Sequence, residues 1–136
     1  MPLDGTNYSP AIDVVTSEGR LKHLITVLRG VPKRKLNMSY WTCGSSACAA
    51  GWAGMDSLFI KQGFFTNMYN VNYHDADENT EYEALHACAK FFQLPYNQAA
   101  YIFMPSAYED RPLIAYDVIQ HIEHVLNKEV EYYHAI

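Results

Sequence analysis

The stretch at residues 84–103, ALHACAKFFQLPYNQAAYIF, decides the fold class, because it predicts two short helices joined by a tight break. Leu85, Ala89 and Phe92 recur at the spacing of one helix face, and Thr80 can cap the start of this helix. Pro95 stands at or just before the start of the second helix, which continues to residue 104. The sequence therefore predicts a packed helical hairpin at this point.

The spacing of this hairpin also resembles a helix-turn-helix, in which the second helix reads DNA. Such a helix needs polar and basic side chains, and residues 96–103, YNQAAYIF, contain no Arg or Lys. The net charge is −5, and the only basic cluster is PKRK at 32–35. Because contacts to phosphate dominate the affinity for nucleic acid, we expect no direct nucleic-acid binding.

Three further helices are predicted on either side of the hairpin. Residues 17–29 carry an apolar stripe, with Thr16 or Ser17 as the cap and with Gly30 and Pro32 after the end. Residues 47–60, ACAAGWAGMDSLFI, are read as one helix of about 14 residues that Ser45 or Ser46 caps. The last helix has Asp110 as its cap and an inner stripe formed by Ala115, Ile119, Ile122, Leu126 and Val130.

The segment 61–79 is the least regular part, and it is predicted to be an insert. A short strand or hairpin around Phe64–Tyr73 and an ordered loop are both compatible with its aromatic and Asn residues. The acidic run DADEN at 75–79 lacks the Gly and the closing Glu of a calcium loop. We expect a solvated turn there, followed by the start of the helix that Thr80 caps.

The fold class is therefore predicted as mostly α, with about five helices and an irregular or short β insert around 61–79. Residues 1–136 form a single domain in this interpretation, and residues 1–16 form an irregular N-terminal arm. The hydrophobic content of 49% is sufficient for a core. The expected core residues are Leu24, Leu28, Trp41, Trp52, Leu85, Phe92, Ile102, Ile119 and Ile122.

Neither a membrane span nor a signal peptide is expected. No stretch approaches the roughly 18 apolar residues of a membrane span. The first ten residues, MPLDGTNYSP, lack a basic and an apolar region. The odd number of cysteines does not make a disulfide framework. We expect a cytoplasmic protein with reduced thiols.

A second motif, LNMSYWTCGSSACAAGWA at 36–53, together with the hairpin, resembles a family of small bacterial and phage proteins of unassigned function. The family pattern is Met-x-x-Trp followed by Cys-Gly-Thr-x-x-Cys-x-x-Gly-His/Trp-Ala. Ser45 replaces the usual Thr, and Trp52 stands where His is common, which argues against an obligatory ligand there. The resemblance implies a bacterial or phage origin and no known reaction. The matching positions are Met38, Trp41, Cys43, Gly44, Cys48, Gly51, Trp52 and Ala53, then Leu94, Gln98, Ala99, Ile102 and Phe103.

Chemistry at the cysteines is the alternative to a structural role. Cys43 precedes an expected helix N-terminus, where a thiolate is stabilised, and His74 or His86 could act as the base of a thiol enzyme. A zinc site is the other alternative, with Cys43, Cys48, His86 and Cys88 as ligands. The bland interpretation is that the cysteines are small buried residues.

The histidines of the last helix raise the same question. Asp117, His121 and His124 share one face of that helix, which could hold a metal at the surface. This face lies opposite the apolar stripe, so a solvated polar face is the simpler interpretation.

No coherent catalytic set emerges, so the sequence favours a small acidic interaction module without catalytic activity or cofactor. The expected partner is a protein with a basic patch, such as a host protein that a phage-encoded module binds or inhibits. The molecule itself is expected to be a monomer or a homodimer. The predicted binding residues are Tyr69, Tyr73, Asp75, Asp77 and Glu78.

Overall fold

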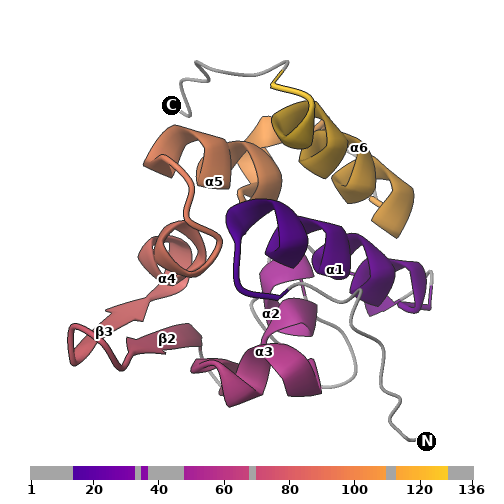
Figure 1. Cartoon of the computed structure of the whole chain (residues 1–136). Coiled ribbons are helices and arrows are strands. Elements are labelled where there is room, and N and C mark those ends of the chain that lie inside the picture. The colour runs from indigo at the N-terminus through magenta and orange to yellow at the C-terminus, as the bar shows by residue number, and fades with distance from the viewer. Residues whose placement is uncertain (1–13, 33–34, 37–47, 68–69, 110–112, 129–136) are drawn as a thin grey trace, which may run out of the picture.

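The computed structural model describes residues 14–32, 35–36, 48–67, 70–109 and 113–128. Six α-helices, one short 3-10 helix and three strands follow one another in this part of the chain (Figure 1). In chain order they are α1 (Ser17–Arg29), α2 (Ala49–Ala53), α3 (Ser57–Lys61), β1 (Phe64–Thr66), β2 (Val71–Asp75), β3 (Thr80–Glu83), α4 (Ala84–Phe91), α5 (Tyr96–Phe103), η2 (Pro105–Ala107) and α6 (Ala115–Leu126).

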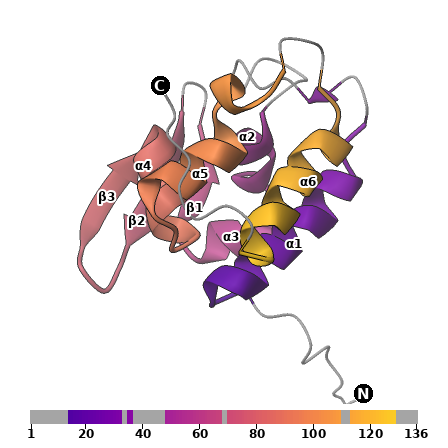
Figure 2. The same ribbon diagram turned by 90° about the horizontal axis from the view of Figure 1, so that it is seen from above.

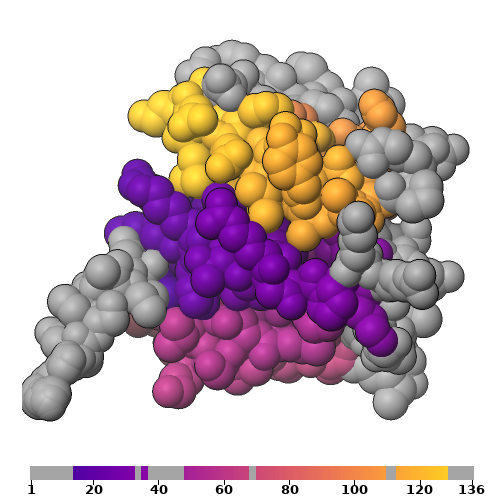
Figure 3. All heavy atoms as spheres, turned by 90° about the vertical axis from the view of Figure 1, so that its right-hand side faces the viewer, coloured from indigo at the N-terminus to yellow at the C-terminus, as the bar shows by residue number. Residues whose placement is uncertain are grey.

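The helices and the sheet occupy different sides of the molecule. The strands form one antiparallel sheet in the order β1-β2-β3, and α4 packs against β2 and β3. Helix α1 contacts both α6 and α2, and α5 lies between α4 and α6 (Figure 2). From the right-hand side of Figure 1, α1 crosses the surface between α6 and the segment that contains α2 and α3 (Figure 3). The hairpin of β2 and β3 therefore projects at the side remote from α6.

Helix α1 confirms the prediction for residues 17–29. The Thr16 hydroxyl accepts a hydrogen bond from the Gly19 amide at 3.0 Å, so Thr16 is the cap. The apolar stripe faces the core, and Gly30 follows the last helical residue. The buried apolar residues of this helix are Leu21, Leu24, Ile25 and Leu28.

The prediction of one helix at 47–60 is wrong, because the chain forms two five-residue helices there. In a continuous helix the Gly54 carbonyl would accept from the amide of residue 58. Instead it accepts from the Thr66 amide of β1 at 3.0 Å, and the Leu58 amide bonds the Asp56 carboxylate at 3.2 Å. A Cβ on Gly54 would lie 2.6 Å from the Thr66 nitrogen. The glycine therefore ends α2 where β1 passes over it, and Asp56 begins α3.

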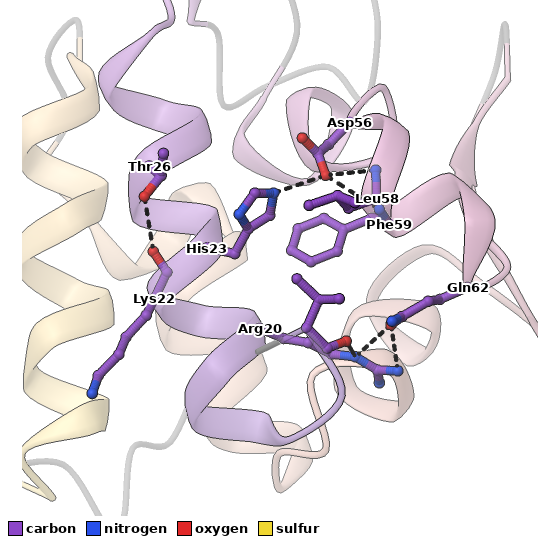
Figure 4. A network of polar contacts seen from close by, with 9 residues as sticks. Arg20, Lys22, His23, Thr26, Asp56, Leu58, Phe59 and Gln62 are labelled. Atoms are coloured by element: carbon purple, nitrogen blue, oxygen red, sulfur yellow. Dashed lines mark hydrogen bonds and ion pairs between the residues drawn. The ribbon is translucent and has the colours of Figure 1, made fainter. Parts of the chain in front are cut away.

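Asp56 also joins α3 to α1. The same carboxylate oxygen accepts from the Phe59 amide at 3.2 Å and from His23 Nε2 at 3.0 Å (Figure 4). The His23 ring meets the Phe59 ring edge-on, with 5.0 Å between centroids. Both partners of the pair are largely shielded, with 14% and 17% of their side chains exposed. A single carboxylate thus caps one helix and fixes its position against another.

The expectation that Thr80 caps a helix is also wrong. Residues Thr80–Glu83 form β3, which pairs with β2 so that Tyr82 lies opposite Tyr73. The helix begins only at Ala84, where φ is 54°. The alternation in TEYE, with a half-buried Tyr82 between exposed acids, is the period of a strand rather than of a helix. The fold is therefore a mixture of helices and a small sheet, with more β structure than predicted.

Five phenylalanines dominate the core. Phe59, Phe64, Phe91, Phe92 and Phe103 are all fully buried, and they touch one another mostly edge to face. Burial of each such side chain contributes roughly 1.5–3 kcal/mol. The α3, β1, α4 and α5 segments thus share one aromatic cluster, of which only Phe92 was predicted to be a core residue.

Most of the other predicted core residues are buried as well, and the helical hairpin is confirmed. Trp52 is only half-buried, and its indole N–H donates to the Lys35 carbonyl at 3.0 Å. Trp41 lies outside the described residues. The core residues confirmed as buried are Leu24, Leu28, Leu85, Phe92, Ile102, Ile119 and Ile122.

Helix α6 keeps the predicted inner stripe in part, because Ala115 and Leu126 are only half-buried against the core. Ile119 and Ile122 are buried together with Val118 and Val125. The Asp117 carboxylate accepts from the Ile114 amide at 2.8 Å at the start of the helix. Asp110, which was expected to cap this helix, and Val130 lie outside the described residues. None of the helices in the described part of the chain combines the length and the apolar character that crossing a bilayer would need.

Candidate functional site

The hairpin of β2 and β3 brings together most of the predicted binding residues. We call residues 71–83 the acidic hairpin. Asp75 ends β2, and its carboxylate accepts from the Asp77 amide at 3.0 Å and the Glu78 amide at 3.2 Å. Tyr73, Asp75, Asp77 and Glu78 therefore share one hairpin, whereas residues 75–79 had been expected to form a turn that leads into a helix. Tyr69 lies outside the described residues.

The acidic hairpin concentrates negative charge. Five acids fall between residues 75 and 83. Within the described part of the chain, none of these carboxylates forms an ion pair with Lys or Arg, and the one paired with a histidine is Glu81, 3.7 Å from His74 Nδ1. Such a cluster is the arrangement that attracts a cationic partner.

Two stacked tyrosines form the apolar side of the acidic hairpin. The rings of Tyr73 and Tyr82 are nearly parallel, with 6.3 Å between centroids. Lys90 Nζ lies 5.3 Å from the centre of the Tyr82 ring, and the Tyr82 hydroxyl donates to Glu78 Oε1 at 3.3 Å. Desolvation and the Glu78 carboxylate raise the pKa of Tyr82. Tyr82 was not predicted as a site residue, because a helix capped by Thr80 was expected there.

Tyr73 connects the hairpin to a buried arginine. The centroids of the Tyr73 and Phe91 rings are 5.3 Å apart. The Arg20 guanidinium carbon lies over the Phe91 ring, 4.0 Å from its centroid. Desolvation and Asp75 raise the pKa of Tyr73, whereas Arg20 opposes the rise. Arg20 is 8% exposed and had no role in the sequence analysis.

Arg20 holds three segments together beneath the sheet. Its Nε donates to the Val14 carbonyl at 2.8 Å, and its Nη2 donates to Gln62 Oε1 at 2.7 Å (Figure 4). Its Nη1 donates to the Phe91 carbonyl. Because a guanidinium presents a rigid fork of donors, one side chain can bridge these positions. The base of the acidic hairpin is therefore a fixed platform.

The two described cysteines do not have the properties of reactive thiols. Burial raises the pKa of Cys48 to about 11, and it raises the pKa of Cys88 well above its usual value. The Cys48 sulfur accepts from the Gly51 amide at 3.3 Å. Cys43, the proposed nucleophile, lies outside the described residues.

The candidate bases and zinc ligands are dispersed in the part of the chain that the structure describes. His74 lies on the sheet, whereas His86 is exposed on α4 and contacts the Tyr96 ring at 5.0 Å. Cys88 is fully buried on the same helix. His86 therefore does not converge with Cys48 and Cys88, and the described residues contain no group of three or more His, Cys, Asp or Glu arranged to hold a metal.

The histidines of α6 are not on a solvated face, which corrects the simpler interpretation of their spacing. The His121 ring lies between the rings of Tyr101 and Tyr108, at 4.0 and 3.9 Å between centroids. Its Nδ1 donates to the Tyr101 carbonyl at 2.7 Å, and His124 Nδ1 lies 2.7 Å from the Tyr101 hydroxyl. Desolvation lowers the pKa of His121. These rings fasten α6 to α5.

No protein-family model, curated protein or solved structure matches the chain. The resemblance to a family of small bacterial and phage proteins therefore stays a prediction. Of the positions in its cysteine motif, the structure describes Cys48, Gly51, Trp52 and Ala53. Three of these four residues are buried and Trp52 is half-buried, in or beside the short helix α2.

Proposed function

We propose that the protein is an interaction module that binds a protein partner with a basic patch through the acidic hairpin. The observation that supports the proposal is the cluster of five acids, none of which pairs with Lys or Arg in the described part of the chain. A cation from a partner would relieve the repulsion between them. Tyr82 is half-buried beside these acids, and aromatic residues are enriched at protein interfaces.

The location of the hairpin supports a binding role. It projects from the side remote from α6, and Arg20, Phe91 and α4 hold its base. A rigid platform loses little conformational freedom when a partner binds. Cytoplasmic location and a phage or bacterial origin belong to the proposal as expectations from the sequence, with inhibition of a host protein as one consequence of such binding.

The experiment uses fluorescein-labelled octa-arginine as the probe and its fluorescence anisotropy as the signal. The variant D77K/E78K reverses two turn charges without altering the Asp75 carboxylate that supports the turn. The variant E18K/E123K makes the same change in net charge on the exposed faces of α1 and α6. We expect the hairpin variant to weaken binding about tenfold and the control to change it less than about twofold.

Equal weakening by both variants would mean that the probe senses only the net charge, and the proposal would then fail. Circular dichroism and the midpoint of thermal unfolding show whether each variant keeps its fold. D77K/E78K removes the hydrogen bond from the Tyr82 hydroxyl to Glu78, and E18K/E123K removes the ion pair of Glu18 with Lys22. Because both contacts are exposed and contribute little, we expect unfolding midpoints close to that of the unmodified protein.

The thiol enzyme that uses Cys43 and the zinc protein remain second and third candidates from the sequence. No observation on the described residues favours either one. The raised pKa values of Cys48 and Cys88 make both of them poor ligands and poor nucleophiles at neutral pH.

A further inference from the structure

The outer face of the sheet is the face opposite α4. Successive side chains of a strand point to opposite faces of the sheet. The side chains that point to this outer face are those of Phe65, Asn72, His74, Glu81 and Glu83. The side chains that point toward α4 are those of Phe64, Val71, Tyr73 and Tyr82. The two strand pairings place Phe65, Asn72 and Glu83 in one row across the sheet. His74 and Glu81 form the next row.

This face combines an exposed aromatic ring with exposed acids. Phe65 is 38% exposed, and Glu81 has 75% of its side chain exposed. Glu83 is exposed and forms no ion pair with any described residue. Phe65 and Glu83 lie at the two ends of one row, about 10 Å apart with Asn72 between them, so a guanidinium can pair with the acid while its apolar stem extends toward the ring.

A polar atom on the same face is unsatisfied. Asn72 lies between Phe65 and Glu83, and its Nδ2 is buried without a hydrogen-bond partner in the described part of the chain. Buried donors without acceptors cost stability, so native structures contain few of them. A carbonyl oxygen of a segment laid over this row would satisfy it if the Asn72 side chain rotates to bring the nitrogen to the surface.

We propose that this outer face is a docking surface for an extended segment of a partner protein that carries arginines at alternate positions. One arginine lies over the row of Phe65, Asn72 and Glu83, and the other lies over Glu81. Glu81 and Glu83 are two residues apart on β3, which corresponds to about 6.6 Å. Alternate side chains of an extended segment repeat over the same distance and point to the same side. The inference rests on the proposed function, because it specifies the partner of the same hairpin.

The test compares two labelled peptides with the same composition. The first has the core Arg-Thr-Arg in a Thr- and Val-rich segment, and the second has the core Arg-Arg-Thr. Adjacent arginines point to opposite sides of an extended segment, so only the first can place both on one face. We expect the alternating peptide to bind at least about fivefold more tightly.

Variants then locate the bound peptide. We expect E81R/E83R to weaken binding of the alternating peptide about tenfold, and F65S to weaken it about threefold. The control E18R/E123R reverses two exposed acids elsewhere and should change binding less than about twofold. Chemical shifts of the Phe65, Asn72 and Glu83 amides should move on titration of the peptide.

Four results would overturn the inference. Equal affinity for the two peptides would remove the requirement for alternation. If D77K/E78K weakens binding and E81R/E83R and F65S do not, the outer face is not the site, although the proposed function of the hairpin survives. If sedimentation shows self-association that E81R/E83R abolishes, a second copy of this chain, with its PKRK segment, occupies the face instead. If D77K/E78K, E81R/E83R and F65S all bind as tightly as the unmodified protein, both proposals are refuted.

Discussion

Replacement of Asp56 by alanine tests how the break between α2 and α3 is stabilised. One carboxylate oxygen accepts from the Leu58 and Phe59 amides at 3.2 Å and from His23 Nε2 at 3.0 Å. Loss of an N-cap costs about 1 kcal/mol. The His23 side chain is only 14% exposed, so its ring N–H loses a partner where water has little access. An unsatisfied donor of this kind costs about 1–3 kcal/mol.

The two contributions predict that D56A lowers the free energy of unfolding by about 2–4 kcal/mol. Urea unfolding followed by circular dichroism measures this change. With a slope of about 2 kcal/mol per molar urea, the midpoint should fall by about 1–2 M. The variant D56N is the matched control, because Asn is as good an N-cap as Asp and retains an oxygen acceptor for His23.

A double-mutant cycle with H23A separates the two contributions. We expect a coupling energy between positions 23 and 56 of about 0.5–3 kcal/mol, because the side chains are in direct contact. The reasoning is refuted if the free energy of unfolding of D56A lies within about 0.5 kcal/mol of that of the unmodified protein, or if the coupling energy is zero. In either case the Asp56 carboxylate does not hold α3 against α1.

Three further predictions concern other parts of the core. G54A should lower stability by more than about 2 kcal/mol in urea unfolding, because the added Cβ would lie 2.0 Å from Thr66 Oγ1 and 2.6 Å from its backbone nitrogen; a smaller loss would mean that β1 can move away. Because desolvation lowers the pKa of His121 in the fold, the unfolded chain binds the proton more readily, so stability should fall as the pH drops below about 6.5. The fall between about pH 7.5 and 5.5 should be smaller in H121F, and an equal fall would assign it to other groups. Cys48 and Cys88 should react with iodoacetamide slowly in the native protein at pH near 8 and rapidly in urea, as measured by mass spectrometry; fast native labelling would contradict their burial.

The helices with a long apolar stripe and clear end signals could be predicted from the sequence. Residues 17–29 show Thr16 before the stripe and Gly30 after it, and local chemistry alone sets both ends. The hairpin of α4 and α5 was also predictable, because Pro95 and the residues before it interrupt two apolar faces. In these segments the local preference and the tertiary packing agree.

The two errors arise where long-range contacts outweigh local preference. Residues 47–60 contain several good helix formers besides the weak ones Gly51 and Gly54, but the Gly54 carbonyl accepts from the amide of Thr66, which is twelve residues away in the chain. Residues 80–83 resemble a helix start, with Thr80 as a plausible cap followed by acids, yet they form a strand because they pair with β2. The turn at Asp75 supplies that pairing, and its geometry depends on one carboxylate that no helix pattern reveals.

The candidate site was only partly predictable, because part of it depends on the pairing of strands that are distant in the sequence. The acidic run at 75–79 and Tyr73 are visible as composition, so they were identified without knowledge of the strands. Tyr82 and Phe65 could not be assigned to opposite faces of a sheet before the register was known. Arg20 gave no signal, because an arginine near a helix start is normally a surface residue.

The cysteine motif shows why a local rule for reactivity can fail. A thiol at a helix N-terminus is expected to have a lowered pKa, since the amides and the helix dipole stabilise the thiolate. Cys48 is such a residue: it caps α2, and its sulfur accepts from the Gly51 amide. Its pKa is nevertheless raised to about 11, because desolvation by burial outweighs the contribution of the amide. A helix of five residues has a small dipole, and the thiol is 2% exposed. The position of a cysteine in a motif therefore predicts its chemistry only together with its burial, and here burial makes Cys48 a packing residue.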